Sequence, residues 1–286
     1  MCLLVVAWKH HPRHRLVVAA NRDEFHERPS APLGWWSDDT RVLAGRDLRS
    51  GGTWMGVSRA GRFAIVTNFR DLERPPAPDA PSRGELVSGF LTGTASPREY
   101  LDRLRPRAAS YAGFNLLVGD ADALHYLTNR DGEAAPRVLE PGVYGLSNHV
   151  LDAPWPKLLR TRRRFTELVA RPDIEPDELF DMLGDRRTAD DDEIPDTGLP
   201  ADWERALSAP FVVHGRYGTR SSTVLLVERD GRTTVIERRF EASGTLTAAT
   251  RLEFDGHVRP GRRMHATGAS VAATHAPDEK PDASPE

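Results

Sequence analysis

Short runs of apolar and β-branched residues occur in pairs along this chain, and a short polar turn joins the members of each pair. The paired runs are residues 2–8 with 15–21, 52–58 with 62–68, 113–119 with 123–129, and 222–228 with 232–238. Two such runs separated by a turn are typical of an antiparallel β-hairpin. Because strands and helices do not alternate regularly, the pattern favours an α+β fold over a doubly wound parallel sheet.

Helical periodicity is found between the paired runs. The segments are residues 82–93, 96–104, 154–170 and 175–185. Ser82 is expected to cap the first segment, and Pro97 lies just inside the start of the second. The third segment is expected to bury one face, formed by Leu158, Leu159, Phe165, Leu168 and Val169.

Three polar stretches interrupt this pattern. Residues 71–82 form a proline-rich loop that is a candidate lid over a site, and residues 186–204 are expected to form a second long loop. From residue 259 to residue 286 the chain has almost no large apolar side chains, so burial cannot offset the entropy of ordering it. We therefore expect one domain over residues 1–258 and a disordered tail over residues 259–286.

Composition restricts the classes of function. A formal net charge of -3 gives no support to a nucleic-acid partner, and one cysteine cannot form an internal disulfide. The apolar run at residues 2–8 is too short to cross a bilayer and makes a poor signal peptide. The sequence predicts a soluble, cytoplasmic protein with no nucleic-acid partner and no stable membrane insertion, and leaves its oligomeric state open.

The single cysteine, Cys2, follows the initiator methionine directly. One interpretation is a small buried residue on the first strand. The other is an N-terminal nucleophile: if Met1 is removed, Cys2 carries both a thiol and a free α-amine. A model α-amine titrates near 7.7–8.0, close enough to neutrality to serve as the base that activates the thiol.

Four polar residues end the strand predicted at 15–21: Asn21, Arg22, Asp23 and Glu24. A hairpin places the end of its second strand beside the start of its first, so this tetrapeptide is expected to lie near Cys2. A carboxylate there can hold the α-amine, and an arginine can hold a thiolate or a substrate oxygen. The alternative is a solvated turn with a local ion pair.

Several short motifs along the chain add to the evidence from Cys2 and the tetrapeptide. In chain order they are "MCL", "ANRDEF" followed by "RPS", "GGTWMGV", "TNFR", "SRGELV" and "YGLSN". Together they resemble the NRDE family, also called the TANGO2-like family after transport and Golgi organisation. That family is similar to the N-terminal-nucleophile hydrolases, above all the choloylglycine hydrolase and penicillin V acylase branch. The resemblance implies an α+β fold, an αββα four-layer sandwich with two antiparallel sheets between helix layers.

The resemblance also implies a catalytic set. It matches Cys2 to the nucleophile, Asp23 to an aspartate that follows an arginine, and Arg220 to a late arginine at the start of a strand. Asn68 and Asn148 match two asparagines of the oxyanion hole, a type of group that suits developing negative charge. Strand-end capping is the alternative for both asparagines. Arg22 directly precedes Asp23, whereas the branch separates the two residues, so the role of Arg22 stays open.

Two functions fit these residues. The first is an N-terminal-cysteine amidohydrolase that acts on a linear acyl-amide, with no cofactor and no metal. The alternative is a non-catalytic carrier of a hydrophobic ligand such as haem or an acyl lipid, since eukaryotic members of the family are linked to haem trafficking and lipid metabolism. A tight turn with His10, His11 and His14 is either solvated or an iron or metal site. Three tryptophans are candidates to line a pocket for an apolar acyl group or ring: Trp35, Trp36 and Trp54. Core packing is the alternative for Trp54.

Removal of residues 259–286 tests the domain boundary. Truncation after Val258 should leave the melting temperature and the reactivity of Cys2 unchanged, because every proposed site residue and every predicted strand precedes the cut. Differential scanning calorimetry of both chains measures this. A drop of several degrees, about 1 kcal/mol or more for a domain of this size, would mean that the tail docks on the fold.

Overall fold

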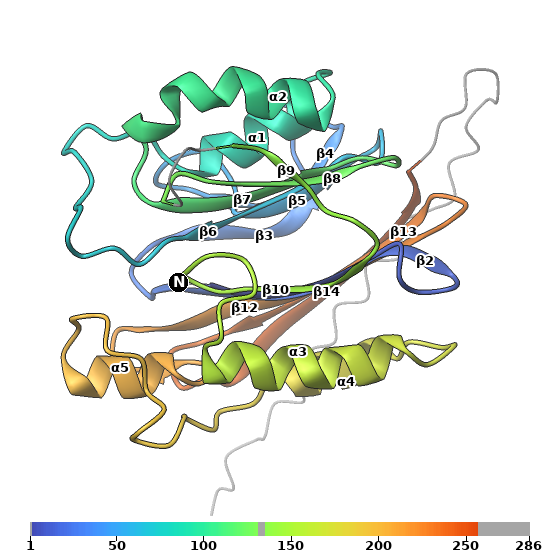
Figure 1. Ribbon diagram of the computed structural model, residues 1–286. Coiled ribbons are helices and arrows are strands. Elements are labelled where there is room, and N and C mark those ends of the chain that lie inside the picture. Colours follow the sequence, from blue (N-terminus) through green and yellow to red (C-terminus); the bar gives the residue numbers. More distant parts are fainter. Residues whose placement is uncertain (1, 131–134, 257–286) are drawn as a thin grey trace, which may run out of the picture.

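The computed structural model describes residues 2–130 and 135–256 and is a four-layer sandwich (Figure 1). Two antiparallel sheets face each other; α1 and α2 cover one sheet, and α3 and α4 cover the other. This arrangement confirms the predicted α+β, αββα architecture. The predictions for Met1 and for residues 259–286 lie outside the described residues.

The first sheet has the strand order β10-β1-β2-β12-β13-β14, and β11 pairs with β12. Its two central strands, β2 and β12, are its longest. The strands are β1 (Cys2–Trp8), β2 (His14–Phe25), β10 (Gly142–Leu146), β11 (Val213–His214), β12 (Tyr217–Glu228), β13 (Arg232–Phe240) and β14 (Leu246–Asp255).

The second sheet is a meander in which each strand pairs with the next one along the chain. Its strands are β3 (Ser30–Trp35), β4 (Val42–Asp47), β5 (Met55–Ser58), β6 (Phe63–Asn68), β7 (Phe114–Gly119), β8 (Leu124–Thr128) and β9 (Arg137–Val138). All the predicted hairpins are present, as β1/β2, β5/β6, β7/β8 and β12/β13.

The four predicted helices are also present. The helices are α1 (Gly84–Thr92), α2 (Pro97–Leu104), α3 (Pro156–Val169), α4 (Pro176–Leu183) and α5 (Ala201–Leu207), with a 3-10 helix, η1 (Arg105–Ser110). Helix α5 lies in the segment that was expected to be a loop, and its Trp203 packs on Phe25 and Tyr217. No helix among the described residues is long and apolar enough to cross a membrane.

Two details of the predicted helices are wrong. Leu159 is 50% exposed, and Lys157 and Thr161 lie on the buried face of α3 with Leu158 and Phe165. At the start of α1 the N-cap residue is Arg83 rather than Ser82. The Ser82 hydroxyl still accepts a hydrogen bond from the Gly84 amide at 3.3 Å.

Alternation along β1 explains why its sequence is apolar throughout. Leu4, Val6 and Trp8 pack in the core between the two sheets. Val5 and Ala7 pack in a second core that includes side chains of α3 and α4. Because both faces of the strand are covered, no position is left for a polar side chain.

A buried histidine pair closes the β1/β2 hairpin. His11 Nε2 lies 2.9 Å from the Arg171 carbonyl, so it is the donor, and His11 Nδ1 then accepts from the amides of Arg13 and His14 at 3.1 Å each. His14 Nδ1 also donates to His11 Nδ1, at 3.1 Å. Both nitrogens of His11 are thus occupied, and no group of three potential metal ligands occurs among the described residues. His10 is exposed.

Acid should therefore remove the stability that this histidine pair contributes. Burial lowers the pKa of His11 and lowers that of His14 to about 4, from an ordinary value near 6.5. Below pH 6.5 the unfolded chain binds more protons than the folded chain, so stability that is complete above pH 6.5 is lost as the pH falls towards 4. The His14 contribution lost between pH 7 and pH 5 is roughly 1–2 kcal/mol.

Denaturant unfolding at pH 7 and pH 5 checks this. His14→Phe keeps a ring beside His11 and removes the titrating group, so it should lose less stability over this interval than the wild type. His10→Phe, at the exposed position, should follow the wild type. Identical losses in all three proteins would refute the assignment.

Candidate active site

The start of β1 and the end of β2 are adjacent in the first sheet. Cys2 lies across from Arg22, and Leu3 lies across from Asn21. On its other side β2 pairs with β12, where Thr219 lies across from Asp23 and Ser222 across from Asn21. The Asn21–Glu24 segment therefore lies between the backbone of Cys2 and strand β12, as the hairpin argument expected.

Asp23 is held in place from β12. Its side chain is 2% exposed, and Oδ1 accepts a hydrogen bond from the Thr219 hydroxyl at 2.7 Å. Its carbonyl accepts from the Tyr217 hydroxyl at 3.0 Å. Burial raises the pKa of Asp23, while the nearby positive charges of Lys157 and Arg22 act in the opposite direction. Asp23 is thus a buried carboxyl in a fixed position beside cationic groups.

Asn21 has a structural role. Its Nδ2 donates to the carbonyls of Leu183 and Pro210, both at 2.9 Å, and its Oδ1 accepts from the Ser222 hydroxyl at 2.6 Å. These contacts join the first sheet to the end of α4 and to the segment before β11. Both polar atoms of the Asn21 side chain therefore form hydrogen bonds inside the protein.

Arg22 points to the opposite face of β2, towards the second sheet. Its guanidinium carbon lies 4.3 Å from the ring centre of Trp54. Glu24 Oε2 lies 3.9 Å from Nη2. The side chain is 6% exposed, and its Nη1 has no hydrogen-bond partner among the described residues.

A cavity of about 430 Å³ opens at this end of the sandwich. Asn68 and Trp54 line it, and one wall comes from Pro76, Pro78 and Pro81 in the loop predicted as a lid. The lining also includes charged residues of both signs: Arg22, Arg28, Arg83, Asp23, Glu24 and Asp47.

The other two candidate tryptophans do not line this cavity. Trp35 stacks with Arg59 and contacts the Phe254 ring edge to face, and Trp36 stacks with Arg46. Trp54 is therefore the one of the three candidates that contributes to the pocket.

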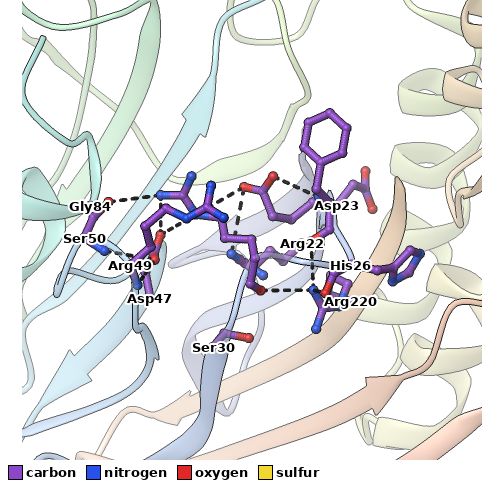
Figure 2. A network of polar contacts seen from close by, with 12 residues as sticks. Arg22, Asp23, His26, Ser30, Asp47, Arg49, Ser50, Gly84 and Arg220 are labelled. Atoms are coloured by element: carbon purple, nitrogen blue, oxygen red, sulfur yellow. Dashed lines mark hydrogen bonds and ion pairs between the residues drawn. The ribbon is translucent and has the colours of Figure 1, made fainter. Parts of the chain in front are cut away.

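Arg220 contacts the loop that follows Glu24. Its Nη1 donates to the carbonyls of Phe25, His26 and Arg28 at 2.9, 3.0 and 3.2 Å (Figure 2). Arg28 in turn forms an ion pair with Asp47 at 2.7 Å. This geometry makes Arg220 a clamp on the loop at the pocket edge, and a direct role for it in catalysis stays a prediction.

The two predicted oxyanion asparagines are adjacent, although 80 residues separate them in the chain. Asn148 Nδ2 donates to the Asn68 carbonyl at 2.9 Å. Asn68 lines the cavity, whereas Asn148 is fully buried and lies behind it. Asn148 thus supports the main chain of Asn68, and the oxyanion role of either side chain stays a prediction.

One residue near the site was not identified from the sequence. Lys157, in the first turn of α3, is 1% exposed and is close enough to Asp23 to influence its ionisation. A signal for it existed, because a lysine on the apolar face of an amphipathic helix is rarely fully buried without a charged neighbour.

The fold is that of the N-terminal-nucleophile hydrolases. Penicillin V acylase from Agrobacterium tumefaciens has the same architecture, with a TM-score of 0.50 and 11% sequence identity, covering 88% of this chain and 91% of that one. At this level of identity the similarity defines the fold alone.

The sequence comparisons are more specific. The profile of the family described as Transport and Golgi organisation 2 matches residues 1–242. The mouse Transport and Golgi organization 2 homolog is 36% identical over 260 residues, covering 83% of this chain and 92% of the mouse protein. The human Transport and Golgi organization protein 2 homolog is 37% identical with the same coverage. The chain therefore belongs to the Transport and Golgi organisation 2 family.

Replacement of Asn21 tests its structural role. Asn21→Ala leaves two buried carbonyls and the Ser222 hydroxyl without their partner, so the free energy of unfolding should fall by about 2–4 kcal/mol. Urea denaturation of the variant and the wild type measures the difference. A loss within about 0.5 kcal/mol, typical of a surface substitution, would show that the Asn21 bridge does not hold the sheet to the helix layer.

Proposed function

We propose that this protein is an amide hydrolase that uses Cys2 as its N-terminal nucleophile and acts on a small acyl-amide. The observation that carries the proposal is the register of β1 and β2. It pairs the backbone of Cys2 with that of Arg22. The side chains of Arg22 and of its neighbour Asp23 line the cavity.

The reaction would proceed in two steps. After removal of Met1, the Cys2 α-amine takes the thiol proton, and the thiolate attacks the amide carbonyl to form a C–S bond. The C–N bond then breaks, and the leaving amine takes the proton from the α-ammonium group. In the second step water attacks the thioester and gives a proton to the α-amine. The C–S bond breaks, which releases the carboxylic acid and restores the thiolate.

The surrounding residues have complementary roles in this proposal. Asp23, fixed by Thr219, orients the α-ammonium group. Arg22 stabilises negative charge on the sulfur, since opposed positions of an antiparallel pair are cross-strand neighbours. Asn68 lies at the cavity wall, where an amide donor can meet the oxyanion. Asn148 and Arg220 hold the segments on which these groups lie.

The cavity lining weighs against the carrier alternative. Sites for haem or a long acyl chain are lined mainly by apolar side chains. This cavity instead has three arginines and three carboxylates among its lining residues. The lining suits an acyl-amide with polar groups. A cytoplasmic location and the absence of a nucleic-acid partner stay predictions from composition.

A panel of acyl-aminocoumarin amides, run beside a haem titration, tests the proposal. The wild type should release aminocoumarin from some members of the panel. Cys2→Ser keeps the shape of the side chain but is a poorer nucleophile, so turnover should fall by about 1000-fold or more. Its melting temperature should match that of the wild type.

Two results would contradict the proposal. One is turnover by Cys2→Ser at the wild-type rate. The other is the absence of turnover in the wild type together with tight haem binding that Cys2→Ser retains, which would support the carrier alternative.

A further inference from the structure

Trp54 lies between two spaces in the sandwich. It lines the cavity beside Arg22, and it also lines a small gap between the sheets together with Glu237 of β13. The guanidinium of Arg22 lies on the indole ring, 4.3 Å from its centre. Trp54 therefore separates the pocket from the interior of the sandwich at the position of Arg22.

Few other groups hold the Arg22 side chain. Its Nη1 has no hydrogen-bond partner in the described part of the chain, and the ion pair between its Nη2 and Glu24 is long, at 3.9 Å. Glu24 has a second cation at the same distance, Arg28. A flat, buried guanidinium with such weak polar contacts depends on the aromatic ring for its orientation.

The indole ring itself is tightly seated. A Cβ atom built on Gly45 of β4 would lie 2.5 Å from Cη2 of Trp54 and 2.7 Å from Cζ2, so no side chain fits at that position. The main chain of Trp54 is fixed as well, because its carbonyl accepts a hydrogen bond from the Val66 amide at 2.9 Å. Ring and backbone are thus both constrained by the second sheet.

We propose that Trp54 is a positioning residue that holds the Arg22 guanidinium at the pocket wall. We further propose that the close approach of Gly45 to the indole fixes the orientation of the ring. The inference rests on the proposed function, because the orientation of Arg22 matters if Arg22 serves the Cys2 thiolate. The contact between Trp54 and Arg22 joins the "GGTWMGV" motif to the "ANRDEF" motif across the two sheets.

Thiol reactivity gives a direct measurement. The chain has one cysteine, so the rate of iodoacetamide alkylation reports on Cys2 alone. Measured against pH, the rate yields the pKa of the thiol, which should lie below the ordinary value of about 8.5 in the wild type. Arg22→Met should raise this pKa. Trp54→Leu should raise it similarly and lower the rate at pH 7 by about threefold to tenfold.

Three further variants distinguish a positioning role for Trp54 from a general loss of structure. Trp54→Phe keeps an aromatic face and should restore most of the rate. Trp36→Leu removes a buried tryptophan that stacks with Arg46 at the same 4.3 Å, away from the cavity, and should behave as the wild type. Gly45→Ala should displace the Trp54 ring and slow alkylation, although Arg22 and Trp54 are both present. If Trp54→Leu does not fold, Gly45→Ala replaces it in the experiment.

A double-mutant cycle decides the mechanism. If Trp54 acts through Arg22, Trp54→Leu should have no further effect in the Arg22→Met background. Additive effects, or normal alkylation in Trp54→Leu when Arg22→Met is slow, would overturn the inference and leave the proposed function in place. A wild-type thiol pKa near 8.5 would overturn both.

Discussion

The pairing of β2 with β12 is the constraint on which the site depends. Hydrogen bonds between buried side chains cross this pair, from Ser222 to Asn21 and from Thr219 to Asp23. Between them the register shifts by one residue, because Thr219 faces Asp23 and Ser221 faces Arg22. The extra residue is Arg220, and such a bulge re-aims a side chain. Arg220 thereby reaches the carbonyls of the loop after Glu24, and one strand irregularity fixes both Asp23 and the edge of the cavity.

Successive side chains of β2 point to opposite faces of the sheet, so neighbouring residues of the tetrapeptide have different roles. Asn21 contacts the end of α4 and joins the sheet to its helix layer. Arg22 projects to the other face and meets the second sheet at Trp54. A shift of β2 by one residue would exchange these faces and bury Arg22 where Asn21 is needed. The same register that stabilises the fold therefore also sets the site.

Much of the architecture could be predicted because both faces of the central strands are covered, which makes their sequences continuously apolar. Strands β3 and β10 were missed since proline and glycine interrupt them, as in "SAPLGW" and "GVYGL". Helix α5 has 7 residues, about two turns, which is too short to show a helical period. For the site, hairpin geometry was enough to bring Cys2 and Arg22 together. The stacking of Arg22 on Trp54 and the bond between Asn148 and Asn68 depend on packing between distant segments, which no local pattern reveals.

In the proposed reaction an N-terminal Cys2 carries the acyl group. Intact-mass and peptide mass spectrometry of the protein, quenched after brief mixing with an activated p-nitrophenyl acyl ester, tests it most directly. If Cys2 is the nucleophile, the chain should lack Met1 and hold one acyl group as a thioester on the N-terminal Cys2. A chain that retains Met1 while it turns over substrate, or an acyl group on any other residue, would contradict it.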